Sequence, residues 1–475
     1  MLVAVFLIRL GKDSHRVTLS RRVKESKMAG SRGQFSSRIG FILAAAGSAV
    51  GLGNIWGFPT QAASNGGAAF LFVYLILAFT LAYPALMAEL IIGRHAHANA
   101  ATALRQISPS AFWSKLGSGV GIVGMVVASL ILSFYAIVAG WMIGFFVAAL
   151  LKLVGLHDAS IWLESFSTAR NLGLMALFMG LTAGIITQGV HGGIEKWSER
   201  LMPILLACLV GLAVYVLTLP GASEGLKIYL LPDFNKAIEP DLILKALGAA
   251  FFSLSLGVGT MLIYGSYISD EEHLPSLGGW VTVTDVSIAV LAGFLVLPAM
   301  YVALHNGIEI FDASGNLLSE DTLIFTVLPA LFDTIGSAGV VLAGFFFFLM
   351  SIAALTSSIS MLEVPVAYFV ERDAGSRPSV TWVATAIITL ISATIILNFE
   401  TLFGLVITLT TRYGQPLLGF MFCIYAGWLW NRDTLLTELK KNNPDAADGL
   451  FWRVWPAYVK VVCPLIILGI FYQSI

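Results

Sequence analysis

The stretch "GSAVGLGNIWGFP", Gly47 to Pro59, lies inside an apolar run that is long enough to cross a membrane as a helix. Its thirteen residues include four glycines and a terminal proline. In a helix interior each glycine costs about 1 kcal/mol relative to alanine, and proline costs about 3 kcal/mol. Backbone groups left unpaired in lipid cost still more. We therefore expect this helix to be interrupted for a functional reason.

The composition is that of a polytopic membrane protein. Of the 475 residues 57% are hydrophobic and only 12% are charged, and the mean hydropathy is +0.86. A helix needs about 20 residues to cross the hydrocarbon core. We expect an all-α membrane protein with 11 transmembrane helices, at residues 38–60, 67–93, 118–151, 172–188, 198–219, 242–268, 278–303, 336–370, 379–397, 401–430 and 455–474.

The basic residues predict the orientation of these spans. With the N-terminus in the cytoplasm, 21 of the 27 lysines and arginines fall on the cytoplasmic side, as the positive-inside rule requires. Arg412 lies within a span, and five basic residues fall outside: Lys152, Arg170, Lys227, Lys236 and Lys245. The odd number of crossings then leaves the C-terminus on the outer side of the plasma (bacterial inner) membrane.

Residues 1–36 are expected to form a basic cytoplasmic tail. The opening "MLVAVFLI" is too short to span a bilayer, and it precedes most of the positive charge, unlike the apolar region of a signal peptide. Met28 is therefore an alternative start of the chain. The net charge of −1 gives no reason to expect a nucleic-acid partner.

A second apolar span is also interrupted by glycines. It reads "FFSLSLGVGTMLIYGSY", Phe251 to Tyr267. "AVGLG" opens the first span and "SLGVG" opens the sixth, so each heads a set of five helices. Matched interrupted helices predict a secondary transporter built from inverted repeats, whereas close helix packing through small residues is the alternative. The predicted units are residues 37–219, residues 220–430, and residues 431–475 with a cytoplasmic loop and the eleventh helix.

Four segments carry a resemblance to a known family. They are "SSRIGFILAAAGSAVGLGNIWGFP", "NGGAAFLFVYLILAF" followed by "PALMAELIIGR", "FFSLSLGVGTM" and "ALTSSISMLEVP". They resemble the first, second, sixth and eighth helices of the neurotransmitter:sodium symporter family, in particular its bacterial LeuT-like amino acid transporters. The resemblance extends over the chain from Arg32 onward. It implies a sodium-coupled importer of an amino acid that works by alternating access.

The resemblance implies two sodium sites made of oxygen ligands. The first uses the carbonyl of Ala49, the side chains of Asn54, Ser253 and Asp285, and the substrate carboxylate. The second uses the carbonyls of Gly47, Val50 and Ala353 and the hydroxyls of Thr356 and Ser357. Two ordinary interpretations compete with these roles: a serine or threonine that bonds a carbonyl of its own helix, and an aspartate near a helix end that reaches cytoplasmic water.

The implied substrate pocket is largely apolar. Its residues are Ala49, Leu52, Gly53, Ile131, Tyr135, Phe252, Ser255, Val258, Ser357 and Met361. Backbone amides after Gly51 and the Tyr135 hydroxyl suit a carboxylate, and freed carbonyls of the sixth helix suit an ammonium group. In the family's amine carriers an Asp occupies the position of Gly51, so its absence predicts a neutral, hydrophobic L-amino acid. Asp285 supplies negative charge near the sodium ions, which predicts transport without chloride.

The gates follow the family pattern only in part. Gly57 stands where the family usually has an Arg, and the tenth span has no acid near Ile407, so the outer ion pair is expected to be absent. Closure would then rest on Tyr135 and Phe252. An inner gate is implied at Arg32, Tyr267 and Glu371, with Phe35 in place of the usual Trp. Glu89 is expected to bond the unwound backbone, and Glu363 has no assigned role.

Other functional classes find weaker support. "GASEG", residues 221–225, matches the hydrolase pattern G-x-S-x-G but follows Pro220 without a preceding strand. His95 and His97 are a weak indication of metal binding, and the three cysteines are expected to be free thiols. A channel is disfavoured by the matched breaks. A non-transporting amino acid sensor, or a carrier of another small zwitterion, remains the alternative, and we expect a monomer or a weak homodimer in the bilayer.

Overall fold

The computed structural model describes residues 33–313, 317–319 and 322–474, and this part of the chain is helical apart from one bridge between Phe311 and Leu317. The first half comprises α3 (Arg38–Ala49), η1 (Gly53–Gly57), α4 (Phe58–Ser64), α5 (Ala68–Leu77), η2 (Ala78–Ala82), α6 (Tyr83–Ala96), α7 (Ala100–Gln106), α8 (Ala111–Leu153), α9 (His157–Glu164), α10 (Thr168–Ile186), η3 (Val190–Glu195) and α11 (Lys196–Leu217). The second half comprises α12 (Ala222–Leu230), α13 (Phe234–Ala237), α14 (Pro240–Ser253), α15 (Thr260–Gly265), α16 (Leu274–His305), η4 (Leu323–Val327), α18 (Leu328–Thr334), α19 (Ser337–Glu371), α20 (Arg377–Leu397), α21 (Phe399–Ile407), η5 (Thr408–Gly414), α22 (Gln415–Ile424), η6 (Tyr425–Leu429), α23 (Arg432–Lys440), η7 (Pro444–Ala447), α24 (Leu450–Ala457), η8 (Tyr458–Val462) and α25 (Cys463–Ser474).

Eight helices of the described residues are long and apolar enough to cross a membrane, and a ninth span is formed if the bent pair Arg38–Ala49 and Gly53–Ser64 counts as one. All nine overlap predicted spans. The two remaining predicted spans differ in form. Residues 242–268 are divided between α14 and α15, and residues 401–430 form one helical run that contains the π-helical segments η5 and η6. The count of eleven crossings therefore stays a prediction.

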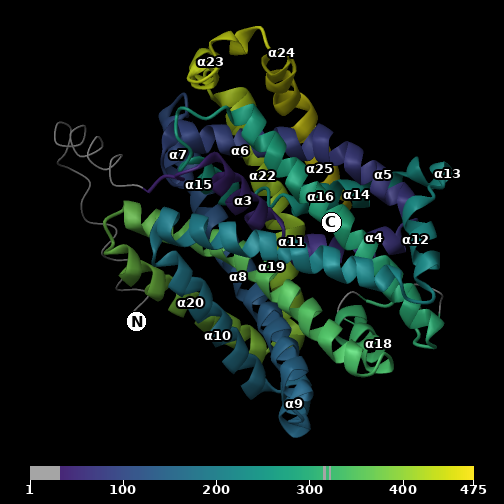
Figure 1. Cartoon of the computed structure of the whole chain (residues 1–475). Helices are drawn as coiled ribbons and strands as arrows, with labels where there is room; N and C mark the ends of the chain where they lie inside the picture. The colour runs from purple at the N-terminus through teal and green to yellow at the C-terminus, as the bar shows by residue number, and fades with distance from the viewer. Residues whose placement is uncertain (1–32, 314–316, 320–321, 475) are drawn as a thin grey trace.

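The long helix α8 runs through the molecule and packs against α19, α10, α7 and α20 (Figure 1). The short helices α9 and α18 lie at one end of the molecule, and α23 and α24 lie at the other. One buried apolar cluster joins α6, α8 and α15, and a second joins α11, α16 and α19. The broken helix α3 with η1 contributes residues to both clusters, and the broken helix α14 with α15 contributes residues to the first.

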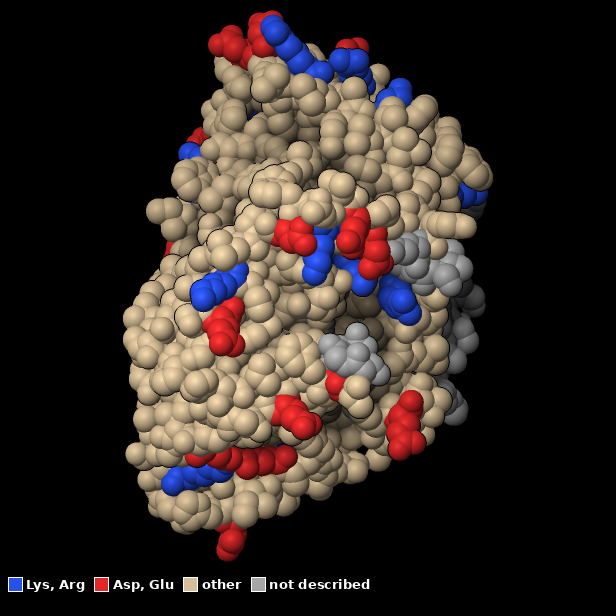
Figure 2. Space-filling model, turned by 90° about the vertical axis from the view of Figure 1, so that its right-hand side faces the viewer, with Lys and Arg blue, Asp and Glu red and all other residues tan. Residues whose placement is uncertain are grey.

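The exterior is largely uncharged. On the face shown in Figure 2, lysine, arginine, aspartate and glutamate are few and gather in small groups. Large apolar side chains point outward, for example Trp382, Leu390 and Leu397 of α20, which are 51%, 68% and 65% exposed. Such a surface is typical of a protein whose solvent is lipid. The three cysteines are free, as expected, with Cys423 and Cys463 buried.

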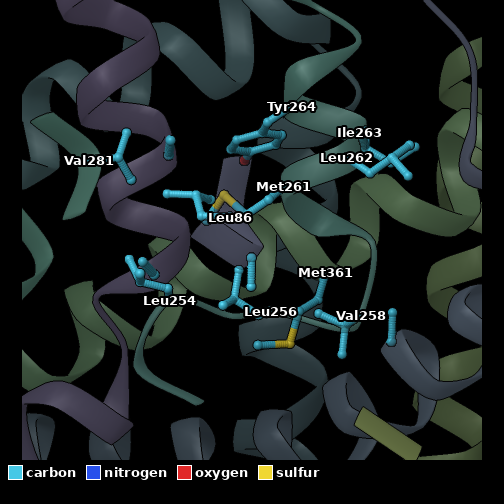
Figure 3. Packing of buried hydrophobic residues seen from close by; sticks show 14 of the residues in the cluster. Leu86, Leu254, Leu256, Val258, Met261, Leu262, Ile263, Tyr264, Val281 and Met361 are labelled. Carbon is cyan, nitrogen blue, oxygen red and sulfur yellow. The ribbon is translucent and has the colours of Figure 1, made fainter. Parts of the chain in front are cut away.

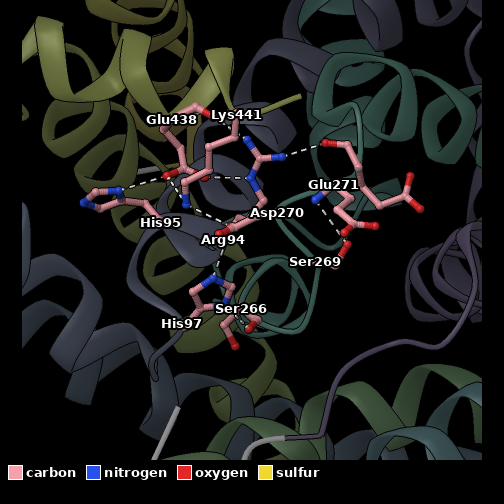
Figure 4. A network of polar contacts seen from close by, with 10 residues as sticks. Arg94, His95, His97, Ser266, Ser269, Asp270, Glu271, Glu438 and Lys441 are labelled. Atoms are coloured by element: carbon pink, nitrogen blue, oxygen red, sulfur yellow. Dashed lines mark hydrogen bonds and ion pairs between the residues drawn. The ribbon is translucent and has the colours of Figure 1, made fainter. Parts of the chain in front are cut away.

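A buried ion-pair network closes the end of the molecule where α6 and α23 meet (Figure 4). Arg94 of α6 is 1% exposed; its Nε lies 2.7 Å from Oε1 of Glu438, and it also donates to the carbonyl of Glu272 at 2.7 Å. Lys441 lies 2.8 Å from Asp270 and 2.9 Å from Glu438. The network therefore ties the chain that follows α15 to α6 and α23.

The network also sets the charge state of Glu438. Burial alone would raise the pKa of this carboxyl, but hydrogen bonds from His95 and Lys441 and the charge of Arg94 lower the pKa to about 2. Because the pKa of Glu438 is lower in the folded state, its charge contributes its full stabilisation of the fold at pH values above the ordinary pKa of 4.5. This stabilisation is lost as the pH falls through about 2, so the charge of Glu438 does not change in the neutral range.

We predict that Glu438→Gln destabilises the fold, because it leaves the buried Arg94 without its counter-charge. Breaking a buried pair from one side costs about 3–5 kcal/mol. The expected result is a clear drop in the melting temperature of the purified protein in detergent, measured at pH 7. The exposed Asp433 in the same helix provides the control, since Asp433→Asn should leave the melting temperature nearly unchanged. Equal melting curves for the two variants would contradict the prediction.

Candidate functional site

The first break explains why Gly51 carries no side chain. Helix α3 ends at Ala49, η1 begins at Gly53, and the two half-helices are bent by 61°. A Cβ atom at Gly51 would lie 2.7 Å from Oγ of Ser357 and 2.9 Å from the hydroxyl of Tyr135. Both distances are shorter than van der Waals contact. A larger residue here would displace the two hydroxyl groups that approach the unwound backbone.

The second break occupies residues 254–259 between α14 and α15. Ser255, Gly257 and Gly259 have φ values of 52°, 82° and 80°, a left-handed conformation that glycine adopts most readily. The backbone N–H of Gly257 donates to Oε1 of Glu89 at 2.7 Å, which confirms the expectation that Glu89 bonds the unwound backbone. The Nε2 of Gln415 donates to the carbonyl of Leu256 at 2.8 Å.

The two breaks are tied directly to each other. The hydroxyl of Ser255 donates to the carbonyl of Ser48 at 3.1 Å. The hydroxyl of Ser357 reaches the carbonyls of Gly47 and Val50 at 3.3 and 3.2 Å. Backbone groups freed by each break are therefore paired with side chains of other helices, as an environment without water requires.

A cavity lies between the breaks and α8, and the empty space in it and at its open mouth together is about 580 Å³. All ten residues predicted for the substrate pocket line it: Ala49, Leu52, Gly53, Ile131, Tyr135, Phe252, Ser255, Val258, Ser357 and Met361. Val258 and Met361 lie next to each other on its wall (Figure 3). Among the lining residues Phe252 is the one that is exposed, at 43%. The cavity is thus apolar on most of its surface and least covered on the side of Phe252.

Four lining residues were not predicted: Ala128, Phe134, Thr260 and Gln415. Ala128 could have been found, because it precedes Ile131 and Tyr135 by three and seven residues and shares their helix face. Gln415 is the one side-chain amide in the predicted span 401–430, and a polar residue within a span is a functional candidate. Gly51 and Asn54 also line the cavity, and Asn54 places the first predicted sodium site beside the predicted substrate pocket.

The side chains predicted for the first sodium site meet in a buried cluster. The Nδ2 of Asn54 donates to Oδ1 of Asp285 at 2.7 Å and to the hydroxyl of Ser253 at 2.8 Å. Ser253 donates to Oδ2 of Asp285 at 2.6 Å. Asp285 is completely buried in the middle of α16, so the alternative of an aspartate that reaches cytoplasmic water is wrong.

Residues of the second predicted sodium site also come together. The Cβ position of Gly47 lies 3.2 Å from Cβ of Thr356, so α3 and α19 are in close contact there. The Thr356 hydroxyl donates to the carbonyls of Ile352 and Ala353 at 3.2 and 3.1 Å. Thr356 therefore bonds carbonyls of its own helix, as a threonine without a ligand role would. It also lies beside the carbonyls that are predicted to bind the second sodium ion.

The oxygen ligands of both predicted sodium sites suit a hard cation. They consist of carbonyl, hydroxyl, amide and carboxylate oxygens, the ligand types that alkali and alkaline-earth cations prefer. The described residues contain no group of three or more His, Cys, Asp or Glu side chains that could hold a metal ion. His95 and His97, considered above as a weak indication of metal binding, contact Glu438 and Asp270 instead.

The predicted inner gate can be followed only in part, because Arg32 lies outside the described residues. Phe35 donates its backbone N–H to the carbonyl of Tyr267 at 3.1 Å, and its ring packs edge-on against Tyr264 and Tyr267. Glu371 accepts a hydrogen bond from the backbone of Asn99 at 2.8 Å.

The structure assigns Glu363 a place that the sequence did not suggest. This completely buried carboxylate lies 2.5 Å from the Arg377 guanidinium and accepts a 2.5 Å hydrogen bond from Tyr267. Arg377 also donates to the carbonyl of Ile186, at the end of α10. The ion pair and its hydrogen bonds therefore join α19, α20, the end of α10 and the turn that follows α15.

The outer ion pair was expected to be absent, and around Trp141 of α8 the contacts are between aromatic rings. A Cβ at Gly57 would meet nothing within 4 Å, and Arg412 is exposed and does not line the cavity. The ring of Trp141 lies 5.1–5.8 Å from those of Phe166, Phe325 and Phe399. This cluster joins α8 to the segments around α9, η4 and α21.

Comparisons with known proteins agree on one family. The sequence model of the Sodium:neurotransmitter symporter family matches residues 32–166 and 165–475. A sodium-dependent transporter of Bacillus subtilis (strain 168) is 32% identical over 93% of this chain and 97% of its own length. The sodium- and chloride-dependent taurine transporter of Homo sapiens is 27% identical, but this chain covers only 52% of it. The crystal structure of MhsT in complex with L-phenylalanine superposes with a TM-score of 0.80 and 35% identity, over 94% of this chain and 100% of MhsT.

We predict that Thr356→Ala lowers the apparent affinity for sodium. Removing one ligand of a cation, like removing a hydrogen bond to a charged group, should weaken binding about tenfold or more. The matched control is Ser351→Ala in the same helix, because the Ser351 hydroxyl bonds only the carbonyl of Phe347 among the contacts seen. Sodium titrations of ligand binding measure both. Equal, small effects would indicate that Thr356 serves helix packing alone.

Proposed function

Since the chain belongs to the sodium:neurotransmitter symporter family, we propose that it is a sodium-coupled symporter that imports a neutral, hydrophobic L-amino acid. Members of this family are transporters and not enzymes. The observation that carries the proposal is the cavity between the two broken helices, which has an aspartate-containing oxygen cluster at its border. Its walls match a small molecule with one charged end and an apolar side chain.

The proposed substrate orientation follows from the two ends of the broken helices. The segment η1 begins at Gly53, so backbone N–H groups near the start of a helix face the cavity and favour a carboxylate. Helix α14 ends at Ser253, where its free carbonyls favour an ammonium group. The Tyr135 hydroxyl, 3.4 Å from the backbone N of Leu52, would add a donor to the carboxylate. MhsT, crystallised with L-phenylalanine, supports an amino acid with a large side chain.

Two sodium ions are proposed as cotransported substrates. The first would be ligated by Ala49, Asn54, Ser253, Asp285 and the substrate carboxylate, and the second by Gly47, Val50, Ala353, Thr356 and Ser357. Two ions bring a charge of +2, and a zwitterionic amino acid brings none. A fixed carboxylate in the low-dielectric interior greatly favours such loading. Asp285 would provide this charge, so that no chloride ion is needed.

The proposed architecture has eleven crossings: two inverted five-helix repeats, residues 37–219 and 220–430, and an eleventh helix within residues 431–475. The corresponding positions of the breaks after Ala49 and Ser253 support the repeat. The N-terminus would lie in the cytoplasm and the C-terminus outside, with Arg32, Tyr267 and Glu371 on the cytoplasmic side. The protein would act in the plasma membrane as a monomer or a weak homodimer.

A sodium-dependent amino acid sensor on the same fold is the second candidate function. Such a protein would keep the cavity and the ion sites but would not move substrate across the membrane. Binding experiments do not separate the two candidates. Flux of a radiolabelled amino acid into sealed proteoliposomes does, since only a carrier accumulates substrate.

We predict that uptake of hydrophobic amino acids into proteoliposomes depends on an inward sodium gradient. Because the substrate carboxylate is a ligand of the first ion, replacing sodium by potassium should abolish both uptake and the thermal stabilisation of the protein by substrate. A screen of the twenty amino acids in each salt measures the second effect. Full uptake driven by a proton gradient alone would contradict the proposal.

We also predict that transport persists when chloride is replaced by gluconate, because Asp285 carries the balancing charge. Asp285→Asn keeps the shape of the side chain but removes that charge, so most of the activity should be lost. The variant should regain part of its activity only if an anion is supplied. A native protein that stops in gluconate, or an Asp285→Asn variant with unchanged sodium dependence, would exclude Asp285 from this role.

A further inference from the structure

Gln415 lines the cavity, and only one of the two polar atoms of its side chain makes a hydrogen bond with another described residue. It is the first residue of α22, is 3% exposed and lines the cavity. Its Nε2 donates to the carbonyl of Leu256 at 2.8 Å. A carbonyl only accepts hydrogen bonds, so this contact decides which end of the amide is nitrogen. The other end of the amide, which the contact with Leu256 does not use, is consequently the oxygen Oε1.

The oxygen Oε1 of Gln415 is buried and has no hydrogen-bond partner among the described residues. Buried acceptors are nearly always satisfied, and one that is not destabilises the state in which it occurs. A ligand that brings a donor to this oxygen therefore gains more than one that brings an apolar group, because the apolar group leaves the acceptor unpaired.

Ala128 of α8 is a small residue that lines the same cavity as Gln415. About one turn earlier on that helix, a Cβ at Gly124 would only just touch the carbonyl of Val258 at 3.9 Å and the side chain of Leu418 at 4.0 Å. Ala128 and Tyr135 are seven residues apart on one helix, which corresponds to about 10 Å. An aromatic amino acid whose carboxylate lies near Tyr135 reaches over such a distance with its ring.

We propose that Gln415 selects the substrate side chain by accepting a hydrogen bond, at Oε1, from an N–H or O–H donor on an aromatic ring. The indole N–H of tryptophan and the phenol O–H of tyrosine share this chemistry, and phenylalanine lacks it. A pocket with a polar group rejects an analogue that cannot pair with it more strongly than it rejects a change of size. This inference rests on the proposed function, since it requires that the cavity holds an amino acid.

The test compares ligands of nearly equal shape on the full-length protein in sodium. L-tryptophan is paired with L-3-benzothienylalanine, in which sulfur replaces the ring N–H, and L-tyrosine is paired with L-phenylalanine. The native protein should bind the donor-bearing member of at least one pair about five- to tenfold more tightly. The pair that shows this preference tells whether indole or phenol is the donor. Equal affinities within both pairs would overturn the proposal.

Two variants separate selection from a structural role. Gln415→Met removes Oε1 and also the bond to Leu256, so a purely structural effect lowers the affinity for all four ligands and leaves the ratios unchanged. The proposal requires that the ratio falls to about one. Thr260→Val is the matched control: it lines the same cavity, its hydroxyl already bonds the carbonyl of Ser255 at 3.2 Å, and the native ratio should persist.

The outcomes also separate this inference from the proposed function. If no amino acid binds in sodium, both the proposed function and the role of Gln415 are wrong. If amino acids bind in sodium and the ring donor makes no difference, only the role of Gln415 is wrong. Should Gln415→Met fail to fold, equal affinities within both ligand pairs on the native protein would still overturn the role of Gln415.

Discussion

The arrangement of the cavity depends on one constraint: a backbone N–H or C=O at membrane depth has no water to bond. Two helices break within the apolar interior, and each break frees such groups. Glu89 and Gln415 bond the N–H and C=O groups of the second break, and Ser357 reaches carbonyls of the first. These side chains come from α6, α22 and α19, so pairing the backbone also brings together the helices that surround the cavity.

The two sides of the cavity are closed by different kinds of contact. Toward α7 and α23, the ion pair of the buried Glu363 with the partly exposed Arg377 is joined by Tyr267 and by the carbonyl of Ile186. Glu363 alone would be a buried and uncompensated charge, so this contact depends on the placement of Arg377. Toward α9 and α18, aromatic rings pack together around Trp141, and Lys152 at the end of α8 pairs with Glu164 of α9 at 2.7 Å.

Much of this arrangement could be predicted from the sequence, and the exceptions have physical reasons. Glycines within apolar spans identified both breaks, and the resemblance of the segments around them identified the ten pocket residues. The contact between Glu363 and Arg377 could not be inferred, because it joins two helices whose relative placement depends on the whole bundle. Gln415 was missed because hydropathy along a span reports how apolar a face is, and one amide changes that little. The number of crossings stays open for a related reason: length and hydropathy do not tell a span divided by a break, such as 242–268, from two shorter helices.

The geometry of the aspartate cluster links ion binding to the position of the broken helices. Asp285 of α16 accepts hydrogen bonds from Asn54 of η1 and from Ser253 at the end of α14, and both donors are neutral. A cation shared by these three side chains interacts with the full charge of Asp285, whereas neutral donors compensate only part of it. In the proposed mechanism the ion therefore holds one half of each broken helix against α16. The substrate carboxylate adds a ligand from the cavity side, so the ion and the amino acid each favour the arrangement that the other requires.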